Sequence, residues 1–349
     1  MLRVRAALAA IATPIAAKAA LECTINQKKK MDKQAKIYVA GHRGLAGSAI
    51  VRELQRQGYT NLVTRSHAEL DLEDAAATQQ FINQERPEIV FLAAAKVGGI
   101  HANNTLPVDF LMSNLLIEAN ICRAAHATKV ARLIFLGSSC IYPRDCPQPI
   151  KEEYLLTGTL EATNRPYALA KIAGIEMCWS YNRQYGTKWL AAMPTNLYGS
   201  GDNYDLNNSH VLPALIRKMH EAKVAGAREV VLWGSGTPKR EFLYVDDLAS
   251  ALVFLATLDE PRYDELVNAA QCPLINVGTG EDLTIRALAE TIAEVVGFTG
   301  KFVQDTSKPD GTMRKVMDVS KIRALGWQPT VALHEGIALA YQDFQKSKA

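Results

Sequence analysis

From Lys36 onward, short and nearly continuous apolar runs alternate with longer helical stretches, and this rhythm constrains the fold most strongly. The apolar runs are expected to form strands at 36–41, 61–65, 88–95, 132–139 and 189–199. The stretches between them have the length and pattern of helices, at 48–58, 75–85, 109–127 and 167–186. Strands that are apolar throughout are typical of a parallel sheet covered on both faces by helices. The sequence therefore predicts an α/β fold with a doubly wound parallel sheet of the Rossmann type.

The regular alternation of apolar runs and helical stretches ends at about Gly199, which suggests a change of architecture. A polar loop is followed by a helix with a proline in its first turn, then by short strands such as REFLYVDD and a final helix. We predict a nucleotide-binding domain over 35–199 and a smaller substrate-binding lobe over 200–349, with segments that return to the main sheet. Residues 1–34 are expected to be an N-terminal extension outside the fold.

Charge and cysteine usage limit the partners and the compartment. Residues 1–33 carry seven Lys/Arg and two acidic residues, whereas the rest of the chain carries 32 basic and 34 acidic residues. That balance argues against nucleic-acid binding, and no apolar run is long enough to suggest a membrane span. The six cysteines form no CxxC pair, which is typical of a reducing compartment and predicts a cytoplasmic protein. The basic, alanine-rich start leaves a secretory signal or a transit peptide as alternatives.

A glycine-rich loop, GHRGLAG, follows the first expected strand and opens the first expected helix. Gly41, Gly44 and Gly47 would allow backbone N–H groups at the helix start to approach a pyrophosphate. The strand–turn–helix setting makes the motif a strong sign of dinucleotide binding. Its GxxGxxG spacing resembles the extended form of the short-chain dehydrogenase/reductase superfamily.

The residues after the second strand favour NADP(H) over NAD. Enzymes that use NAD usually end this strand with an acid that binds the ribose 2′-hydroxyl, but NLVTRSH has none. Arg43, Arg65 and His67 instead suit the negative charge of a 2′-phosphate.

Three residues predict carbonyl chemistry. Tyr167 and Lys171 are four positions apart and therefore share one face of a helix. A lysine ammonium beside a phenol is expected to lower the pKa of the phenol toward neutrality. Ser138 lies one strand–helix unit earlier and is expected to hydrogen-bond a substrate carbonyl; the less favoured alternative is a turn hydroxyl that satisfies backbone groups.

Cys140 is a further candidate because it stands two positions after Ser138. In related sugar-nucleotide dehydratases this place holds a carboxylate base, and a thiolate at the mouth of a strand could act as one. The alternative is a small buried cysteine with a packing role.

The chain resembles the GDP-L-fucose synthase family from about Met31 to its last helix, in the segments GHRGLAGSAI, AAAKVGGIHANNT, FLGSSCIYP, NNSHVLPALIRK and KPDGTMRK. The resemblance implies an NADP-dependent oxidoreductase with isomerase activity. Such an enzyme epimerises carbons 3 and 5 of GDP-4-keto-6-deoxy-D-mannose and reduces carbon 4, giving GDP-L-fucose. Enzymes of this type are commonly homodimers, and no metal is expected.

The resemblance also assigns roles to residues. It makes Ser138, Tyr167 and Lys171 the reductase set, and Cys140 and His210 the epimerisation base and acid. It places the NADP site on Gly41, His42, Arg43, Gly44, Leu45, Gly47, Leu136, Gly137, Ser138, Ser139, Lys171, Pro194, Thr195, Asn196, Leu197 and His210. It places the GDP-sugar contacts on Lys218, Trp233, Arg240 and Lys301. Members of the family can carry arginine at the positions of His67 and Lys218.

Simpler roles remain open for three of these residues. His210 could be an ordinary exposed loop histidine, Arg240 could form a salt bridge with Asp246 or Asp247, and Trp233 could fill the lobe interface.

Two other functions compete with this one. The first is a different sugar-nucleotide epimerase or dehydratase with tightly held NAD, which Arg43, the missing acid and Cys140 disfavour. The second is a catalytically inactive dinucleotide sensor, which the intact set of Ser138, Tyr167 and Lys171 disfavours.

Overall fold

A computed structural model describes residues 31–206, 209–307 and 310–348, so most of the expected N-terminal extension lies outside the described residues. The main sheet has six strands in the order β10-β5-β4-β3-β1-β2, and all of its pairings are parallel. The strands are β1 (Ile37–Ala40), β2 (Leu62–Val63), β3 (Ile89–Leu92), β4 (Arg132–Leu136), β5 (Trp189–Pro194) and β10 (Leu274–Val277).

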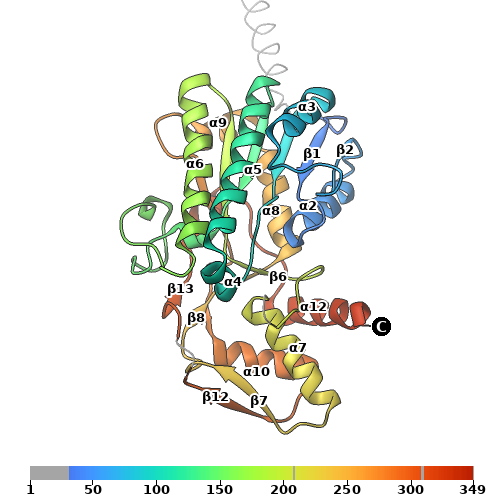
Figure 1. Ribbon diagram of the computed structural model, residues 1–349, viewed down its shortest axis with the longest axis vertical. Helices are drawn as coiled ribbons and strands as arrows, with labels where there is room; N and C mark the ends of the chain where they lie inside the picture. Colours follow the sequence, from blue (N-terminus) through green and yellow to red (C-terminus); the bar gives the residue numbers. More distant parts are fainter. Residues whose placement is uncertain (1–30, 207–208, 308–309, 349) are drawn as a thin grey trace, which may run out of the picture.

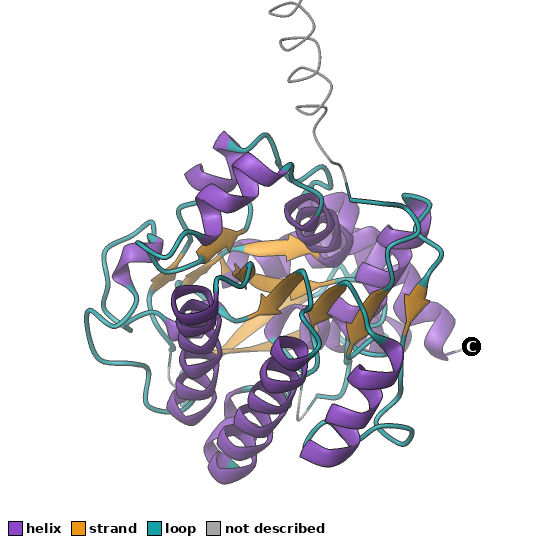
Figure 2. Ribbon diagram, turned by 90° about the horizontal axis from the view of Figure 1, so that it is seen from above, coloured by secondary structure: helices purple, strands orange, loops and turns teal. Residues whose placement is uncertain are grey.

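Helices cover both faces of this sheet, as Figure 2 shows from above. On one face α3 (Ala75–Glu85), α5 (Pro107–Ala127) and α6 (Arg165–Tyr185) pack side by side, with the short α4 (Ile100–Thr105) before α5. On the other face α2 (Leu45–Arg56) packs against α8 (Val245–Ala256). The predicted doubly wound α/β fold is confirmed.

A smaller lobe lies below the sheet in Figure 1. It contains helices α7 (Val211–Val224), α10 (Ile285–Val296) and α12 (Leu333–Lys348). Two strand pairs are β6 (Asn196–Tyr198) with β9 (Phe242–Tyr244), and β7 (Glu229–Trp233) with β12 (Lys301–Asp305). A small three-stranded sheet has β8 (Lys239–Arg240) between β11 (Leu283–Thr284) and β13 (Arg314–Lys315). The lobe has its own apolar core, which includes Ile216, Leu232, Ile292 and Phe344.

The chain crosses between the lobes several times. Although it follows the first elements of the small lobe in the sequence, β10 joins the edge of the main sheet. The helix α9 (Glu260–Val267) lies against β5, and α11 (Ser320–Ala324) lies against β10. Two short 3-10 helices, η1 (Ser139–Ile141) and η2 (Glu152–Tyr154), follow β4. None of the helices in the described ranges combines the length and the apolar character that crossing a bilayer requires.

The expected strand at REFLYVDD is wrong in its second half. Arg240 ends β8 and Phe242–Tyr244 forms β9, whereas Val245 begins α8. Most of α8 is buried, including Leu248, Leu252 and Leu255. A helix that is apolar on nearly all sides has no amphipathic period, so the sequence pattern did not separate it from a buried strand.

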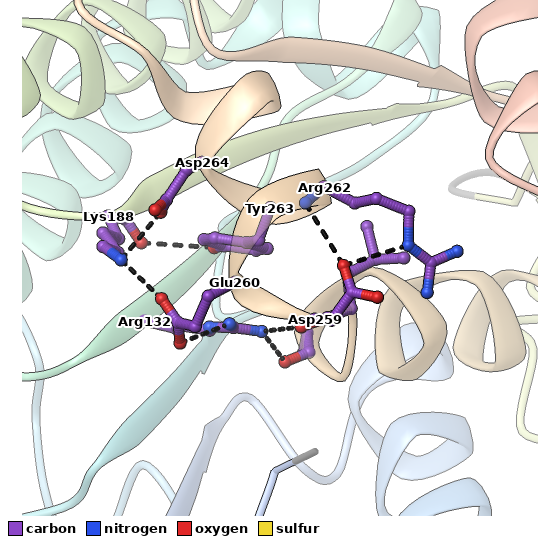
Figure 3. Close-up of polar contacts among 9 residues, drawn as sticks. Arg132, Lys188, Asp259, Glu260, Arg262, Tyr263 and Asp264 are labelled. Atoms are coloured by element: carbon purple, nitrogen blue, oxygen red, sulfur yellow. Dashed lines mark hydrogen bonds and ion pairs between the residues drawn. The ribbon is translucent and has the colours of Figure 1, made fainter. Parts of the chain in front are cut away.

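Polar contacts fix α9 at the end of the sheet opposite the carboxyl ends of the strands (Figure 3). The guanidinium of Arg132, at the start of β4, donates to the carbonyl oxygens of Ala256 at 2.7 Å and Leu258 at 2.8 Å. It also pairs with Glu260 at 2.8 Å. Lys188, just before β5, bridges Glu260 and Asp264. These contacts lie at the end of the sheet where β4 and β5 begin, opposite the end where the strands finish.

Candidate active site

A cavity of about 1300 Å³ lies at the carboxyl ends of the strands and is lined by both lobes. The sheet side contributes the glycine loop, the segment after β3, the start of η1 and the segment after β5. The small lobe contributes residues from α7, β7, β8 and β13. Open α/β sheets bind ligands at this end of their strands.

The glycine loop has a shape that side chains would destroy. Gly41 has φ +84°, and a Cβ added there would lie 2.7 Å from the backbone of Ala94. A Cβ on Gly47 would lie 2.1 Å from the carbonyl oxygen of Gly41. No side chain caps Gly44 at the start of α2, so the first N–H groups of this helix are available. Among the described residues, the buried Nδ1 of His42 also lacks a hydrogen-bond partner. The loop fits a dinucleotide pyrophosphate.

Most of the predicted cofactor residues line the cavity, namely Gly41, Gly44, Leu45, Gly47, Arg65, His67, Leu136, Gly137, Ser138, Ser139, Lys171, Pro194, Thr195, Asn196, Leu197 and His210. Arg43 is exposed, and neither it nor His42 is among the lining residues. The guanidinium of Arg65, which lines the cavity, pairs with the carboxylate of Glu85 at 2.9 Å.

Three reactive side chains gather on one wall of the cavity. The Ser138 hydroxyl caps η1 by accepting a hydrogen bond from the Cys140 backbone N–H at 3.4 Å, and the Cys140 thiol lies 3.1 Å from the same oxygen. Ser138 also hydrogen-bonds the phenol of Tyr167. Cys140 is half-buried and lines the cavity, so its thiol is not part of the apolar core.

The expected effect of Lys171 on Tyr167 is not found. The Lys171 ammonium donates to the carbonyl oxygen of Leu136 at 3.1 Å and pairs with the carboxylate of Glu118, also at 3.1 Å. Desolvation, together with Cys140 and Glu118, raises the pKa of Tyr167 well above its ordinary value, and the Ser138 hydrogen bond only partly opposes this. Tyr167 therefore keeps its proton at neutral pH.

The small lobe brings three of the predicted residues to the cavity. His210 stands at the N-cap of α7, where desolvation lowers the pKa of its imidazole. Lys218 lies 4.7 Å above the ring of Trp233, and desolvation lowers the pKa of the lysine.

Arg240 also lines the cavity, and the proposed salt bridges to Asp246 and Asp247 do not form. Asp246 pairs with Arg52, and Asp247 accepts from the backbone of Thr330 at 3.1 Å. Desolvation lowers the pKa of Arg240, with Asp310 opposing the shift. The guanidinium is therefore available to an anionic ligand in the cavity.

Lys301 is not brought to the cavity, which corrects the expectation for this residue. In the β7–β12 pair, Lys301 is opposite Glu229, whereas Asp305 is opposite Trp233. Four residues of strand place Lys301 about 13 Å from the Trp233 end.

Sequence reasoning missed two charged residues near the reacting groups. Lys315 on β13 lines the cavity opposite Arg240 in register, and desolvation lowers the pKa of its ammonium, with Cys140 opposing. Glu118 lies buried beside Lys171. The signal for Glu118 was an acid inside the apolar stretch LLIEANI, which is unusual for a buried helix.

The comparisons with known proteins agree with this arrangement. The sequence profile of the NAD dependent epimerase/dehydratase family matches residues 37–270. The chain is 58% identical to GDP-L-fucose synthase 1 of Arabidopsis thaliana, over 90% of this chain and 95% of that protein. It is 54% identical to GDP-L-fucose synthase of Escherichia coli strain K12, over 91% of this chain and 98% of that protein.

Solved structures give the same result. The crystal structure of a GDP-L-fucose synthetase from Naegleria fowleri bound to NADP superposes with a TM-score of 0.83 at 30% identity. The match covers 93% of this chain and 96% of that chain. The chain belongs to the NAD dependent epimerase/dehydratase family and, within it, to the GDP-L-fucose synthase group.

Proposed function

We propose that this chain converts GDP-4-keto-6-deoxy-D-mannose to GDP-L-fucose, by inversion of carbons 3 and 5 followed by NADPH-dependent reduction of carbon 4. The relatives at 54% and 58% identity are both named GDP-L-fucose synthase. The observation that carries the proposal is the shared wall, where the Cys140 thiol lies 3.1 Å from the Ser138 hydroxyl that hydrogen-bonds Tyr167.

The inversions need a base and an acid beside a polarised ketone. The ketone at carbon 4 acidifies the hydrogens on carbons 3 and 5, so one base can serve both centres. Cys140 as thiolate takes the proton, and His210, which reaches the cavity from the other lobe, returns one to the opposite face. The resulting enolate oxygen is stabilised by the hydroxyls of Ser138 and Tyr167.

The reduction uses the same oxygen site. Bound NADPH supplies the hydride at carbon 4. Tyr167 is protonated at neutral pH and donates its proton to the developing alkoxide. Ser138 holds the oxygen through both stages, so the sugar need not leave between them.

The remaining predicted residues hold the ligands. The glycine loop and the start of α2 would bind the cofactor pyrophosphate, with Arg65 and His67 near its ribose phosphate. In the small lobe, the cations Lys218 and Arg240 suit the GDP phosphates, and Trp233 suits stacking of the base. Lys301 has no part in this proposal.

The functional form in this proposal is a homodimer. Val108, Met112 and Leu116 follow each other at spacings of four on α5 and are 68%, 46% and 37% exposed. Leu169 on the neighbouring α6 is also exposed. Apolar side chains on one helix face favour burial against a second copy.

The test is a single assay with purified protein, NADPH and GDP-4-keto-6-deoxy-D-mannose in deuterated water. The proposal predicts NADPH oxidation, GDP-L-fucose as the product, and deuterium at carbons 3 and 5. Absence of NADPH oxidation would refute the proposal. Oxidation without inversion would leave a simple ketone reductase.

A further inference from the structure

The turn that carries Cys140 is held only weakly by its own backbone. It is the 3-10 helix η1, which spans Ser139–Ile141. Its last backbone hydrogen bond, from the N–H of Tyr142 to the carbonyl oxygen of Ser139, is 3.5 Å long. Short 3-10 helices have poorer hydrogen-bond geometry than α-helices. The direction of the Cys140 thiol therefore depends on what holds the two ends of this turn.

Side chains hold both ends of the turn. At its start, the Ser138 hydroxyl accepts from the backbone N–H of Cys140 at 3.4 Å. At its end, Tyr142 is only 3% exposed, and its hydroxyl donates to Oδ1 of Asn276 on β10 at 2.6 Å. The second hydrogen bond is the shorter of the two, and it ties the end of η1 to the edge strand of the main sheet.

The amide group of Asn276 is held in one orientation. Its Nδ2 donates to the carbonyl oxygens of Ile150 at 3.0 Å and Asp318 at 3.1 Å. Both partners are acceptors, so the NH2 group must face them and Oδ1 must face the phenol. The backbone N–H of Asn276 donates to the carboxylate of Glu152 at 3.0 Å. A buried polar network whose members are all hydrogen-bonded specifies a single arrangement of the segments that it joins.

Asn276 is the polar residue of the buried strand β10 and has no exposed surface. Burial of an amide costs free energy unless its groups are hydrogen-bonded, whereas an apolar residue would complete the strand without that need. On the sheet side, the hydrogen bonds of Asn276 reach Tyr142, two positions after Cys140. On the small-lobe side they reach Asp318, three positions after Lys315 on β13. The amide therefore holds the turn with the thiol and the end of β13 in one arrangement.

We propose that Tyr142 and Asn276 are positioning residues that hold the Cys140 thiol toward the sugar ring for removal of the ring protons. The proposal rests on the proposed function. In that step the C–H bond at carbon 3 or carbon 5 breaks, the proton passes to the thiolate sulfur, and the electron pair forms the enolate. Without the Tyr142 hydroxyl the end of η1 loses its anchor, and the thiol lies in position for a smaller fraction of the time. Misplacement of a reacting group by about 1 Å can cost about 100-fold in rate.

Tyr142→Phe removes the hydroxyl and keeps the ring, so it tests the anchor. The matched control is Tyr263→Phe, because Tyr263 is also buried and its hydroxyl donates to the carbonyl oxygen of Lys188 at 3.2 Å, at the opposite end of the sheet (Figure 3). In deuterated water, with NADP⁺ in place of NADPH, Tyr142→Phe should lower the rate of deuterium incorporation at carbons 3 and 5 by about 10-fold or more, with KM for the GDP-sugar unchanged. Tyr263→Phe should leave this rate near that of the natural protein. Equal rates in the natural protein and Tyr142→Phe would overturn the proposal.

A double variant tests whether the anchor acts through the thiol. When Cys140→Ala is already present, the addition of Tyr142→Phe should cause no further loss of deuterium incorporation, because residues that act through one another are not additive. A further loss of about 10-fold in this background would contradict the proposal, since the phenol would then act by another route.

Backbone amide exchange measures the anchor without turnover. In hydrogen-exchange mass spectrometry, the amides of residues 138–146 should exchange about 10-fold faster in Tyr142→Phe than in the natural protein, because the turn opens more often. The same amides should exchange at the natural rate in Tyr263→Phe. Unchanged protection of this segment in Tyr142→Phe would contradict the positioning role, whereas a failure of the natural protein to oxidise NADPH would contradict only the proposed function.

Discussion

At the scale of single residues, the proposed mechanism assigns two proton-transfer tasks to neighbouring side chains. Cys140 lines the cavity beside the Ser138 hydroxyl, where a thiolate could take a proton from the sugar ring. Tyr167 is desolvated, which raises its pKa and keeps it protonated. In the proposed mechanism a base and an acid therefore stand on one wall of the cavity.

This separation predicts the behaviour of Cys140→Ala. Loss of the base should lower deuterium incorporation at carbons 3 and 5 by about 100-fold or more, while NADPH affinity stays near that of the natural protein. Cys146→Ala removes a half-buried thiol that is not among the residues lining the main cavity, and should leave exchange unchanged. Exchange and binding are measured by NMR and by fluorescence titration. Normal exchange in Cys140→Ala would exclude the thiol from the mechanism.

At the scale of elements, the loop between β6 and α7 is held by the C-terminal helix α12. The Gly201 N–H donates to Asp343 at 2.9 Å, and the Tyr204 hydroxyl donates to the carbonyl oxygen of Ala340 at 2.9 Å. Asp202 in the same loop has a buried Oδ2 without a hydrogen-bond partner among the described residues. Burial, with Asp343 nearby, raises the pKa of Asp202 to about 7.

This raised pKa predicts a pH-dependent cost in stability. Because an unfolded aspartate titrates near pH 4, the folded state binds more protons between about pH 4 and 7, and stability falls as pH rises through that window. Asp202→Asn should remove the cost, raising the melting temperature more at pH 8 than at pH 5. Asp145→Asn, at a side chain that is 86% exposed, is the matched control. Calorimetry that shows an equal effect at both pH values would reject this account of the loop.

The elements also show where sequence reasoning succeeds and where it stops. The strands β1 to β5 of the main sheet were predictable because each is a short, mainly apolar run, and the glycine loop because its motif is local, whereas the sequence did not assign β10 to this sheet. The helix α8 was missed because it is apolar on nearly every side. The pairing of Glu118 with Lys171 joins two helices far apart in sequence, and only packing reveals it. Lys301 was assigned by resemblance alone, and the register of the β7–β12 pair, which the sequence does not show, places it away from the cavity.

At the scale of the whole molecule, the exposed apolar face of α5 predicts the oligomeric state. Leu116→Glu places a charge on the proposed dimer surface and should shift the protein to monomers at micromolar concentration. Val224→Glu changes an exposed valine at the end of α7 and should leave the assembly intact. Sedimentation velocity measures both. A dimer that persists in Leu116→Glu, or a monomer in the natural protein, would contradict the proposed interface.

The place of β10 at the edge of the main sheet has a practical consequence for dividing this protein. A truncated product that ends near residue 199 keeps the glycine loop but lacks the strand that pairs with β5 and the helix α8 that packs on α2. Its β5 backbone would be left open to association with other chains, as unprotected sheet edges generally are. The nucleotide half is therefore a poor candidate for separate production, and any deletion series should spare residues 245–277.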